Sequence, residues 1–430
     1  MNDKKLFLQG LTRPNDDQND ARRYDLLIGN GKILAFGPSG SFEAPADAVP
    51  EKTDGCLLLA SLIDAHTHLR EPGFEYKEDI RSGLAAAAHG GFGAVLAMAN
   101  TRPVNDCAPV TRLMLDKATL HHPHGPFLHP VGALSIGLEG SELAPMGELA
   151  EAGVKAISND GRPVRNNELF RRAMEYAATW GLIVIDHCED PDLSNGVQMN
   201  EGPQSTRFGL KGQSTVGEAL QVARDILLSE YLDLPVHLAH ISCRQSVDLI
   251  RWAKSRGVKV TAETCPHYLL LDDSLLAAYD TRFKVSPPLR GKSDVQAMLE
   301  AVNDGTIDIL VTDHAPHAAH EKEVPFDEAP NGFIGLETAL PLTLDLVRQG
   351  LLRADRLEEL WCRKPAEIFK LRHNSFKPGD PADFILVDPQ SAWTVDTSSI
   401  HSKSLNSPWL GLELRGKVVG HWLGGYKIIG

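Results

Sequence analysis

Short apolar segments alternate with amphipathic segments over most of the chain. The apolar segments stay hydrophobic almost to their last residues, which is typical of parallel strands buried on both faces of a sheet. Stretches such as 166–180 and 245–257 carry apolar residues at spacings of three and four, which predicts helices. The apolar segments are 57–66, 93–100, 126–134, 154–160, 182–189, 235–242, 258–267 and 307–316. This alternation predicts an α/β fold, a (β/α)8 TIM barrel rather than an open sheet.

Both ends of the chain follow a different pattern. Residues 24–37 alternate in polarity and turn through Gly-Asn-Gly, as a β-hairpin does. Residues 377–388 and 414–429 have the same character. We therefore expect the two ends to pair into one small β-rich domain beside the barrel. The expected boundaries place residues 1–57 and 371–430 in the small β domain and residues 58–370 in the barrel.

Composition limits the classes of partner. The chain has 430 residues, 42% of them hydrophobic, and a formal net charge of -14. An acidic surface does not attract nucleic acid or an anionic membrane, so neither is expected as a partner. No segment approaches the roughly 18 to 20 apolar residues that a membrane span needs. A small anionic substrate stays compatible with this charge, because a local cationic pocket outweighs distant acidic groups.

The cysteines and the N-terminal segment indicate the compartment. The six cysteines are scattered and form no Cys-x-x-Cys pair, which indicates free thiols in a reducing environment. Residues 1–20 lack the sustained apolar core and the cleavage site of a signal peptide. We therefore expect a cytoplasmic protein.

Polar residues cluster where the predicted strands end. His66 and His68 lie at the end of the first predicted strand, and residues two apart on a strand share a face, as one arm of a metal site could. Two such histidines alone more often reflect chance. Other strand ends carry Asn100, Asp160, His187, His240 and Asp313, and barrel enzymes keep their catalytic groups at this end. Imidazole and carboxylate without thiolate suit Zn²⁺, Mn²⁺ or Co²⁺, and six ligands favour two ions bridged by a carboxylate.

Several motifs resemble those of a known family. Residues 64–73, "DAHTHLREPG", are similar to the first-strand signature of cyclic amidohydrolases, and "MANTRP" at 98–103 to the second-strand motif of dihydroorotases. The motifs "SNDGRPV", "DHCED", "LAHIS", "FKVSPPLR", "TDHAPH" and "GFIGLETALPL" follow in the order found in bacterial dihydroorotases. The resemblance extends from about residue 25 to residue 425. It implies a zinc-dependent barrel enzyme that reversibly hydrolyses (S)-dihydroorotate to N-carbamoyl-L-aspartate in pyrimidine biosynthesis.

The resemblance also implies roles for the strand-end residues. His66 and His68 match the ligands of a first zinc ion, and His187 and His240 those of a second. Asp160 matches a bridging carboxylate, and Asp313 a residue that is both metal ligand and catalytic base. Many relatives bridge their metals with a carbamylated lysine, but this chain has Ser158 at that place, and Lys155 is expected to be a surface residue. The chain therefore resembles the subgroup that bridges its metals with an aspartate.

Substrate contacts follow from the same resemblance. The planar guanidinium of Arg70 suits a bidentate contact with the substrate carboxylate, and Asn100 and His317 match the other carboxylate contacts. His314 competes with His317 for that role, and the motif favours His317. The remaining expected substrate contacts are His68, Ser286, Asn331 and Gly332. Ser286 and Asn331 depart from the residues usual in the family, which leaves the substrate preference open.

Two alternative functions differ from the one above in the bridging lysine and the metal ligands. A related amidohydrolase acting on hydantoins, dihydropyrimidines or allantoin usually carries the bridging lysine, and a non-catalytic scaffold for aspartate carbamoyltransferase lacks metal ligands. This chain lacks the bridging lysine and keeps all of the expected metal ligands, so neither alternative is favoured. The family suggests a homodimer and leaves a complex with aspartate carbamoyltransferase open. A loop that closes over the site is expected at 160–165 or 318–332, and the polar stretch 121–129 is interpreted as a surface loop.

Overall fold

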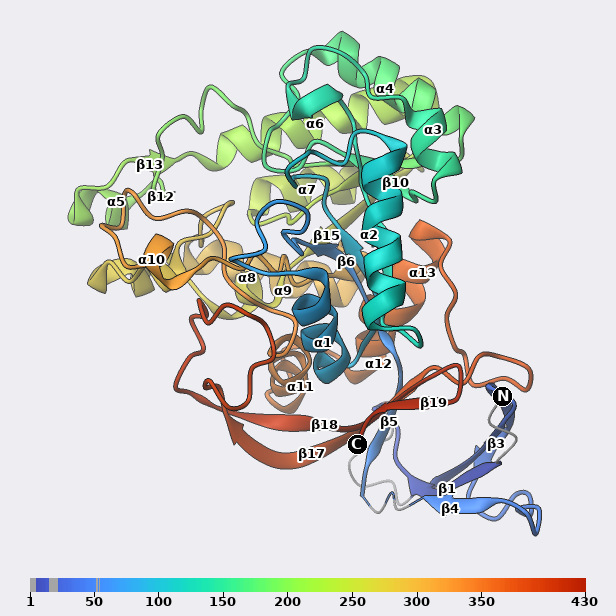
Figure 1. Ribbon diagram of the computed structural model, residues 1–430. Coiled ribbons are helices and arrows are strands. Elements are labelled where there is room, and N and C mark those ends of the chain that lie inside the picture. Colours follow the sequence, from blue (N-terminus) through green and yellow to red (C-terminus); the bar gives the residue numbers. More distant parts are fainter. Residues whose placement is uncertain (1–4, 15–21, 52, 54) are drawn as a thin grey trace.

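A closed barrel of parallel strands, surrounded by helices, forms the centre of the computed structural model, which describes residues 5–14, 22–51, 53 and 55–430 (Figure 1). β8 and β9 are separated by Val131 alone and continue one another, so the barrel has eight strand positions. The barrel strands are β6 (Leu62–Thr67), β7 (Phe92–Ala97), β8 (Phe127–Pro130), β9 (Gly132–Ala133), β10 (Ala156–Ser158), β11 (Ile183–Asp186), β14 (Val236–Leu238), β15 (Val260–Thr264) and β16 (Ile309–Leu310).

The barrel strands pair in chain order. One run of hydrogen-bonded strands is β6-β7-β8 and the other is β9-β10-β11-β14-β15-β16, all of them parallel. A parallel bridge between Thr67 and His314 brings the end of the last strand beside the end of the first. Each strand position overlaps one of the apolar segments, and the predicted α/β barrel is confirmed.

Helices lie between the strands and bury one face each. α4 (Asn167–Thr179) begins after Asn166, whose side chain accepts hydrogen bonds from the first-turn N–H groups of Glu168 and Leu169. Its buried residues, Phe170, Ala173, Met174 and Ala177, recur at helical spacing. The other helices of the barrel region are α1 (Ile80–Gly90), α2 (Ala108–His121), α3 (Met146–Glu151), α5 (Pro203–Phe208), α6 (Thr215–Leu232), α7 (Arg244–Ser255), α8 (Pro266–Leu270), α9 (Lys292–Asp304), α10 (Ala319–Lys322), α11 (Ala339–Arg348), α12 (Ala354–Glu358) and α13 (Lys364–Phe369).

The barrel interior is packed with apolar side chains from successive strands. Leu96, Val131 and Ile185 belong to one buried cluster with Ala239 and Val311. A second, larger cluster fills the space between the strands and the helices. With a filled interior, polar side chains are accommodated only near the strand ends, which is where the candidate site lies.

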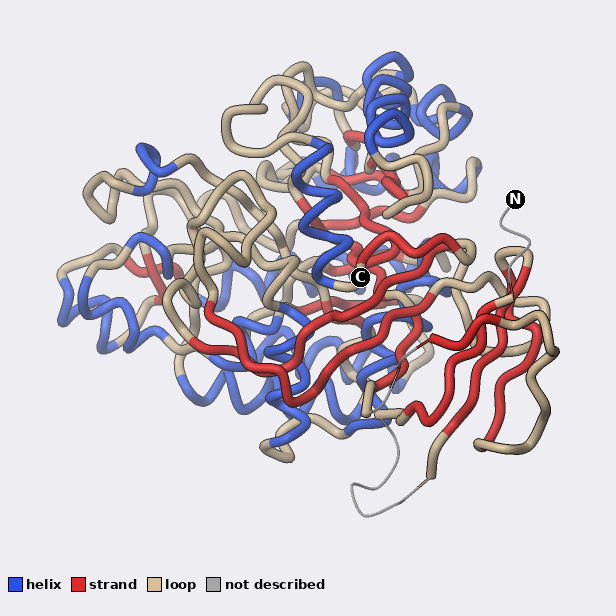
Figure 2. Tube along the Cα trace, turned by 60° about the horizontal axis from the view of Figure 1, so that its bottom comes forward, coloured by secondary structure: helices blue, strands red, loops and turns tan. Residues whose placement is uncertain are grey.

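The two ends of the chain form sheets outside the barrel (Figure 2). The N-terminal sheet has the order β3-β2-β1-β4, from β1 (Leu6–Leu11), β2 (Tyr24–Gly29), β3 (Lys32–Pro38) and β4 (Val49–Glu51). The second has the order β19-β18-β17-β5, from β5 (Leu57–Ala60), β17 (Phe384–Thr394), β18 (Glu413–Leu423) and β19 (Tyr426–Ile429).

The strands of the two ends form two separate sheets, which are linked at a few positions. Only β5 crosses over, where it lies antiparallel to β17, and the isolated bridge between Lys32 and Pro381 links the two sheets. The expected boundary after residue 57 falls inside β5, and Ser61 alone separates β5 from the first barrel strand. The expected hairpin at 24–37 is present, with Asn30 (φ 53°) and Gly31 (φ 74°) both left-handed, as a tight hairpin turn requires.

No helix in the part of the chain that the structure describes is long and apolar enough to cross a membrane. Residues 1–4 and 15–20 of the N-terminal segment interpreted above lie outside the described residues.

Candidate metal centre

Six side chains from five strand ends converge at one end of the barrel. His66 lies in β6 and His68 directly follows it, whereas the others lie within three residues after their strands. The topology brings together the C-terminal ends of neighbouring parallel strands, so residues far apart in sequence become neighbours. The other converging residues are Asp160 after β10, His187 after β11, His240 after β14 and Asp313 after β16. The structure thus brings together all six residues interpreted as metal ligands.

Asp160 lies at the centre of this cluster. Its carboxylate oxygens lie 3.3 Å from His66 Nε2, 3.5 Å from His68 Nε2, 3.3 Å from His187 Nδ1 and 3.7 Å from His240 Nε2. Two groups of ligand atoms therefore share this carboxylate: His66, His68 and Asp160 form one, and Asp160, His187 and His240 the other. Asp313 lies beside the first group, with its Oδ1 3.1 Å from His68 Nε2.

The nitrogen and oxygen atoms of the cluster are suited to binding divalent metal ions. His66 Nε2 is buried and has no hydrogen-bond partner, although a buried polar atom normally has one. His240 Nε2 and His187 Nδ1 lie only 2.7 Å apart and converge on the same carboxylate. Imidazole nitrogens and carboxylate oxygens are the ligands that zinc takes in catalytic sites. These residues fit two ions that share Asp160.

Buried partners fix the orientation of the imidazoles. Glu263, at the end of β15, accepts a hydrogen bond from His66 Nδ1 at 2.7 Å and lies 3.0 Å from His237 Nε2. This leaves His66 Nε2 facing Asp160. His68 Nδ1 lies 3.0 Å from Asn100 Oδ1. This contact leaves the Nε2 of His68 facing Asp313. Such partners set which nitrogen faces a metal and raise the basicity of the ring.

Sequence reasoning did not single out Glu263. Its signal was a lone carboxylate near the end of the apolar segment 258–267, where a parallel strand is expected to be apolar. Glu189 was also missed, although it belongs to the motif "DHCED". Its Oε2 accepts a hydrogen bond from Ser286 Oγ at 2.9 Å and lies 3.5 Å from His187 Nε2.

The histidines of the cluster stabilise the ionised form of its buried carboxylates. Burial alone would raise the pKa of Asp160, but the facing histidines, led by His66, hold it well below its usual value. Burial would likewise raise the pKa of Glu263, and His66 and His237 lower it instead. Both carboxylates therefore stay ionised, and an ionised carboxylate is the form that binds a metal ion.

A cavity of about 280 Å³ opens onto the cluster. It holds the expected substrate contacts together with most of the metal-ligand candidates. Its lining residues are His68, Arg70, Asn100, Asp160, Gly161, His187, Glu189, His240, Ser286, Asp313, Ala315, His317, Asn331 and Gly332. Of the expected metal ligands and substrate contacts, only His66 lies outside this list, because its side chain is completely buried.

Arg70 brings an unneutralised positive charge to the cavity. Its Nε donates to Pro316 O at 3.1 Å, and its Nη2 lies 3.4 Å from His317 Nε2. It forms no ion pair with any carboxylate of the residues that the structure describes. Burial lowers its pKa to about 10, which still leaves it charged at neutral pH. A half-buried guanidinium that forms no ion pair has donors to offer, so an anionic ligand is the expected partner.

Three cavity residues have an unusual backbone conformation. Arg70 (φ 63°), His240 (φ 34°) and Asp313 (φ 48°) are all left-handed, a conformation that residues other than glycine adopt at a cost. Such strain collects at functional sites, where the surrounding structure holds the residues in place. Gly332 (φ 112°) is also left-handed, and a Cβ atom there would lie 2.6 Å from Ala315 Cβ. The last position therefore requires glycine.

The structure separates the competing candidates. His317 lines the cavity, whereas His314 is buried and turned to Glu78, 3.4 Å from its Nε2, and to the N–H of Gly335. Lys155 does not approach the cluster but lines a different cavity at the opposite end of the barrel. Ser158 is buried and accepts a hydrogen bond from the N–H of Asp160.

A third group of possible ligand atoms, Asp186, Cys188 and Asp225, already has its cation. The Arg224 guanidinium lies 2.7 Å from Asp186 Oδ2 and 2.7 Å from Asp225 Oδ1. Arg224 therefore ties α6 to the end of β11.

Comparison with known proteins places the chain in a family. A dihydro-orotase-like family model matches residues 55–246. A dihydroorotase of Syntrophus aciditrophicus is 47% identical over 424 residues, which cover 96% of this chain and 97% of that protein. A dihydroorotase of Geobacter metallireducens is 46% identical over 420 residues and covers 98% of both chains.

Solved structures share the fold at much lower identity. An L-hydantoinase (dihydropyrimidinase) from Arthrobacter aurescens has a TM-score of 0.84 at 22% identity, covering 100% of this chain and 96% of that chain. A dihydropyrimidinase from Brevibacillus agri has a TM-score of 0.81 at 22% identity, covering 99% and 95%. These structures support the barrel with accompanying β sheets and by themselves do not specify a substrate.

Together, the fold, the imidazole and carboxylate groups at its mouth, and these relatives define a cyclic amidohydrolase, an enzyme of the hydrolase class. The extent and identity of the sequence matches narrow the class further. The chain belongs to the dihydroorotase family.

Proposed function

We propose that this enzyme is a dihydroorotase that reversibly hydrolyses (S)-dihydroorotate to N-carbamoyl-L-aspartate in pyrimidine biosynthesis. The observation that carries the proposal is the unneutralised Arg70 in the same cavity as the imidazole and carboxylate cluster. The substrate has a cyclic amide and a carboxylate, and the cavity holds groups suited to each. The relatives named dihydroorotase support the same reaction.

The proposed cofactor is zinc, with two ions that share Asp160. His66 and His68 would hold one ion, His187 and His240 the other, and Asp313 would complete the ligand set. When bound, the ions would polarise the ring carbonyl and lower the pKa of a water molecule between them. The unpartnered His66 Nε2 and the position of Asp160 between the two groups support this assignment.

Arg70 would orient the substrate through its carboxylate. A guanidinium presents two parallel N–H donors that match the two carboxylate oxygens. Asn100 and His317 flank it in the cavity, and His317 is held by a 2.8 Å contact between its Nε2 and Asn331 O. This arrangement would place the ring amide toward Asp160 and Asp313, with Ser286, Asn331 and Gly332 along the ring.

Asp313 would move the proton that the reaction requires. In hydrolysis a bond forms between the water oxygen and the ring carbonyl carbon, and the bond from that carbon to the ring nitrogen breaks. Asp313 would accept the proton of the water and return it to the departing nitrogen. Its carboxylate lines the cavity and is positioned by His68. The reverse sequence closes the ring.

Glu189 would prepare Ser286 for its contact with the ring. The Ser286 hydroxyl donates its only proton to Glu189 Oε2, which Gln213 Nε2 also approaches at 3.1 Å. The hydroxyl oxygen then remains as an acceptor. A ring N–H is the substrate group that it suits.

Turnover of both proposed substrates by zinc-loaded protein tests the proposal, with Asp313→Ala as the inactive control. Activity in the wild type that is lost in this variant supports the substrate and the role of Asp313 together. No turnover, despite about two bound zinc ions per chain, would contradict the proposal. Hydantoin and dihydropyrimidine should be assayed in parallel, because neither carries the carboxylate that Arg70 would bind. Faster turnover of these rings would replace the proposed substrate.

Other features of the proposal follow from the family. All proposed site residues lie within 58–370, which we propose as the catalytic domain beside a β domain from both termini. The cytoplasm is the proposed location, and the free thiols of Cys107, Cys188, Cys243, Cys265 and Cys362 support a reducing compartment. A homodimer and a complex with aspartate carbamoyltransferase stay predictions, and light scattering on the protein with and without that enzyme tests both.

A further inference from the structure

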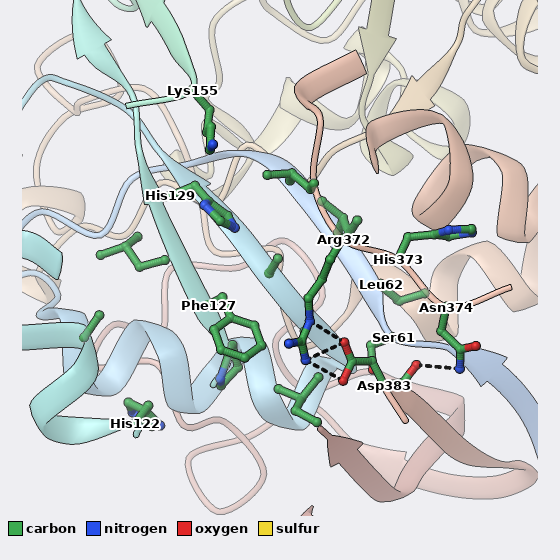
Figure 3. A pocket seen from close by; sticks show the side chains of 18 of the residues that line it. Ser61, Leu62, His122, Phe127, His129, Lys155, Arg372, His373, Asn374 and Asp383 are labelled. Atoms are coloured by element: carbon green, nitrogen blue, oxygen red, sulfur yellow. Dashed lines mark hydrogen bonds and ion pairs between the residues drawn. The ribbon is translucent and has the colours of Figure 1, made fainter. Parts of the chain in front are cut away.

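A second cavity lies at the opposite end of the barrel from the metal-ligand cluster. Figure 3 shows side chains that line it. It encloses about 430 Å³ between the first residues of β6, β7 and β8, the end of α2, and the segment 370–374. This volume is within the range of small-molecule sites. Residues at the N-terminal face of a barrel usually contribute to stability and not to catalysis. A binding site here therefore requires side chains that are suited to a ligand.

The walls of this cavity are largely apolar. Phe127 from β8 lines the cavity (Figure 3), and so do Leu115 and Ala118 of α2. The apolar lining includes Leu115, Ala118, Phe127, Leu128 and Leu371. A ligand with a planar or apolar body would gain from leaving water here.

The cavity lining carries more positively than negatively charged side chains. Lys155, Lys370 and Arg372 line the cavity with a single carboxylate, Asp383. Arg372 already satisfies that carboxylate, with Nε and Nη2 each donating at 2.7 Å, and Gly424 N donates to it as well. Arg372 also lies over the Phe127 ring, 4.6 Å from its centroid. The two lysines therefore have no counter-ion within the cavity.

Lys155 is the group most available to a ligand. It is exposed, and among the residues that the structure describes it has no hydrogen-bond or ion-pair partner. Lys370 differs, because its Nζ donates to Gly181 O at 3.2 Å. Lys155 points toward His129 across the cavity (Figure 3).

His129 supplies a neutral donor beside this cation. Burial, reinforced by Lys155, lowers the pKa of His129 to about 4, so the imidazole is neutral at physiological pH. Neither ring nitrogen has a hydrogen-bond partner among the described residues. A neutral imidazole carries one N–H, which is free to donate to an anion. His129 and His122, which also lines the cavity, come from the polar stretch 121–129 that the proposed function does not use.

We propose that this cavity binds a small organic anion, with its phosphate or carboxylate group held by Lys155 and His129 and its planar or apolar body packed against Phe127 and Leu115. The site is separate from the metal-ligand cluster and shares no lining residue with the cavity there. The proposal does not depend on the proposed reaction. An anion here would supply the counter-charge that Lys155 lacks.

Calorimetric titration of the zinc-loaded protein with phenyl phosphate, benzoate and inorganic phosphate tests the proposal. We expect saturable binding of phenyl phosphate or benzoate, and which of them binds more tightly identifies the anionic group. Removing the cation in Lys155→Ala should weaken binding about tenfold or more, since a hydrogen bond to a charged group is lost. Lys292→Ala removes a lysine from the surface of α9 and should leave binding unchanged. Filling the space in Ala118→Phe should abolish binding.

Three outcomes would overturn the proposal. The first is no saturable binding of either aromatic anion to the wild type. The second is binding that is equally tight in Lys155→Ala, which places the ligand elsewhere, including at the metal ions. The third is inorganic phosphate binding as tightly as phenyl phosphate, which would mean that the apolar walls take no part. Lys155 is exposed, so its variant tests the proposal even where Ala118→Phe does not fold.

Discussion

Replacing Glu263 with glutamine should weaken zinc binding without unfolding the protein. The Glu263 side chain is completely buried, and it accepts a hydrogen bond from His66 Nδ1 at 2.7 Å while lying 3.0 Å from His237 Nε2. Glutamine has nearly the same shape but carries no charge. His66 would then be a weaker base and a less firmly oriented ligand, because a charge-assisted hydrogen bond is about twice as strong as a neutral one.

The expected loss of zinc affinity follows from the position of Glu263, which holds the proposed metal ligand His66 from behind. Loss of such a partner lowers metal affinity about 10- to 100-fold, which corresponds to about 1.4 to 2.7 kcal/mol. The zinc dissociation constant should be measured by competition with a chromophoric chelator. Turnover should be measured in parallel as a function of free zinc. Activity of Glu263→Gln should return toward the wild-type level at high zinc, because the catalytic groups themselves are intact.

A matched control is available in Glu337→Gln. Glu337 is also a buried carboxylate paired with a histidine, since its Oε1 lies 2.9 Å from His401 Nδ1, but it does not line the cavity. This control should leave zinc affinity unchanged. Our reasoning is refuted when folded Glu263→Gln binds zinc within twofold of the wild type. It is equally refuted when both variants lose affinity to the same extent.

Three further predictions concern substrate binding and stability. Arg70→Lys keeps the charge but loses the planar fork, so KM should rise about 10- to 100-fold with a smaller change in kcat; a fall in kcat alone would contradict the carboxylate contact. Ser286→Asn introduces the residue usual in the family and should lower KM for dihydroorotate about three- to tenfold by reaching further into the cavity; an unchanged KM would remove Ser286 from the proposed contacts. The buried His421 has its pKa lowered by burial from 6.5 to about 4, so the folded state resists the proton that the unfolded chain accepts. Stability is intact above pH 6.5 and is lost as the pH falls toward 4, by about 2 kcal/mol near pH 5. Thermal unfolding of His421→Gln should lack this part of the acid sensitivity, and an equal loss in both proteins would exclude His421 as its source.

The candidate ligands could be found in the sequence because each one interrupts an apolar segment at its end. A strand that is buried on both faces tolerates polar residues only where it leaves the barrel. His187 and His240 therefore stand out, and so does Asp313. The barrel topology then requires such residues to meet, whatever their separation in sequence.

Glu263 and Glu189 could not be assigned in the same way. Glu263 matters because the register of neighbouring strands places it behind His66 and beside His237. Glu189 matters because it meets Ser286, which is distant in sequence, across the cavity. Hydrogen bonds between side chains depend on angles and distances to within about half an ångström, and a residue pattern does not carry that information.

The division of the flanking strands was also beyond the sequence. The alternating segments at both ends predicted strands, but they do not specify which strands share a sheet. The structure keeps four N-terminal strands together and transfers only β5 to the C-terminal sheet. Pairing between strands is a property of the folded chain, because each strand offers the same backbone hydrogen bonds to any neighbour.

The sequence by itself determined the barrel, the end of it that carries the chemistry, and the identity of the candidate ligands, because these depend on the order of apolar and polar residues along the chain. Tertiary structure alone decided that Asp160 lies between two groups of histidines, that Arg70 forms no ion pair with any carboxylate of the described residues, and that Lys155 and His129 share a cavity. The physical reason is that the energies of charges and hydrogen bonds depend on distance and burial, which only the packed chain establishes.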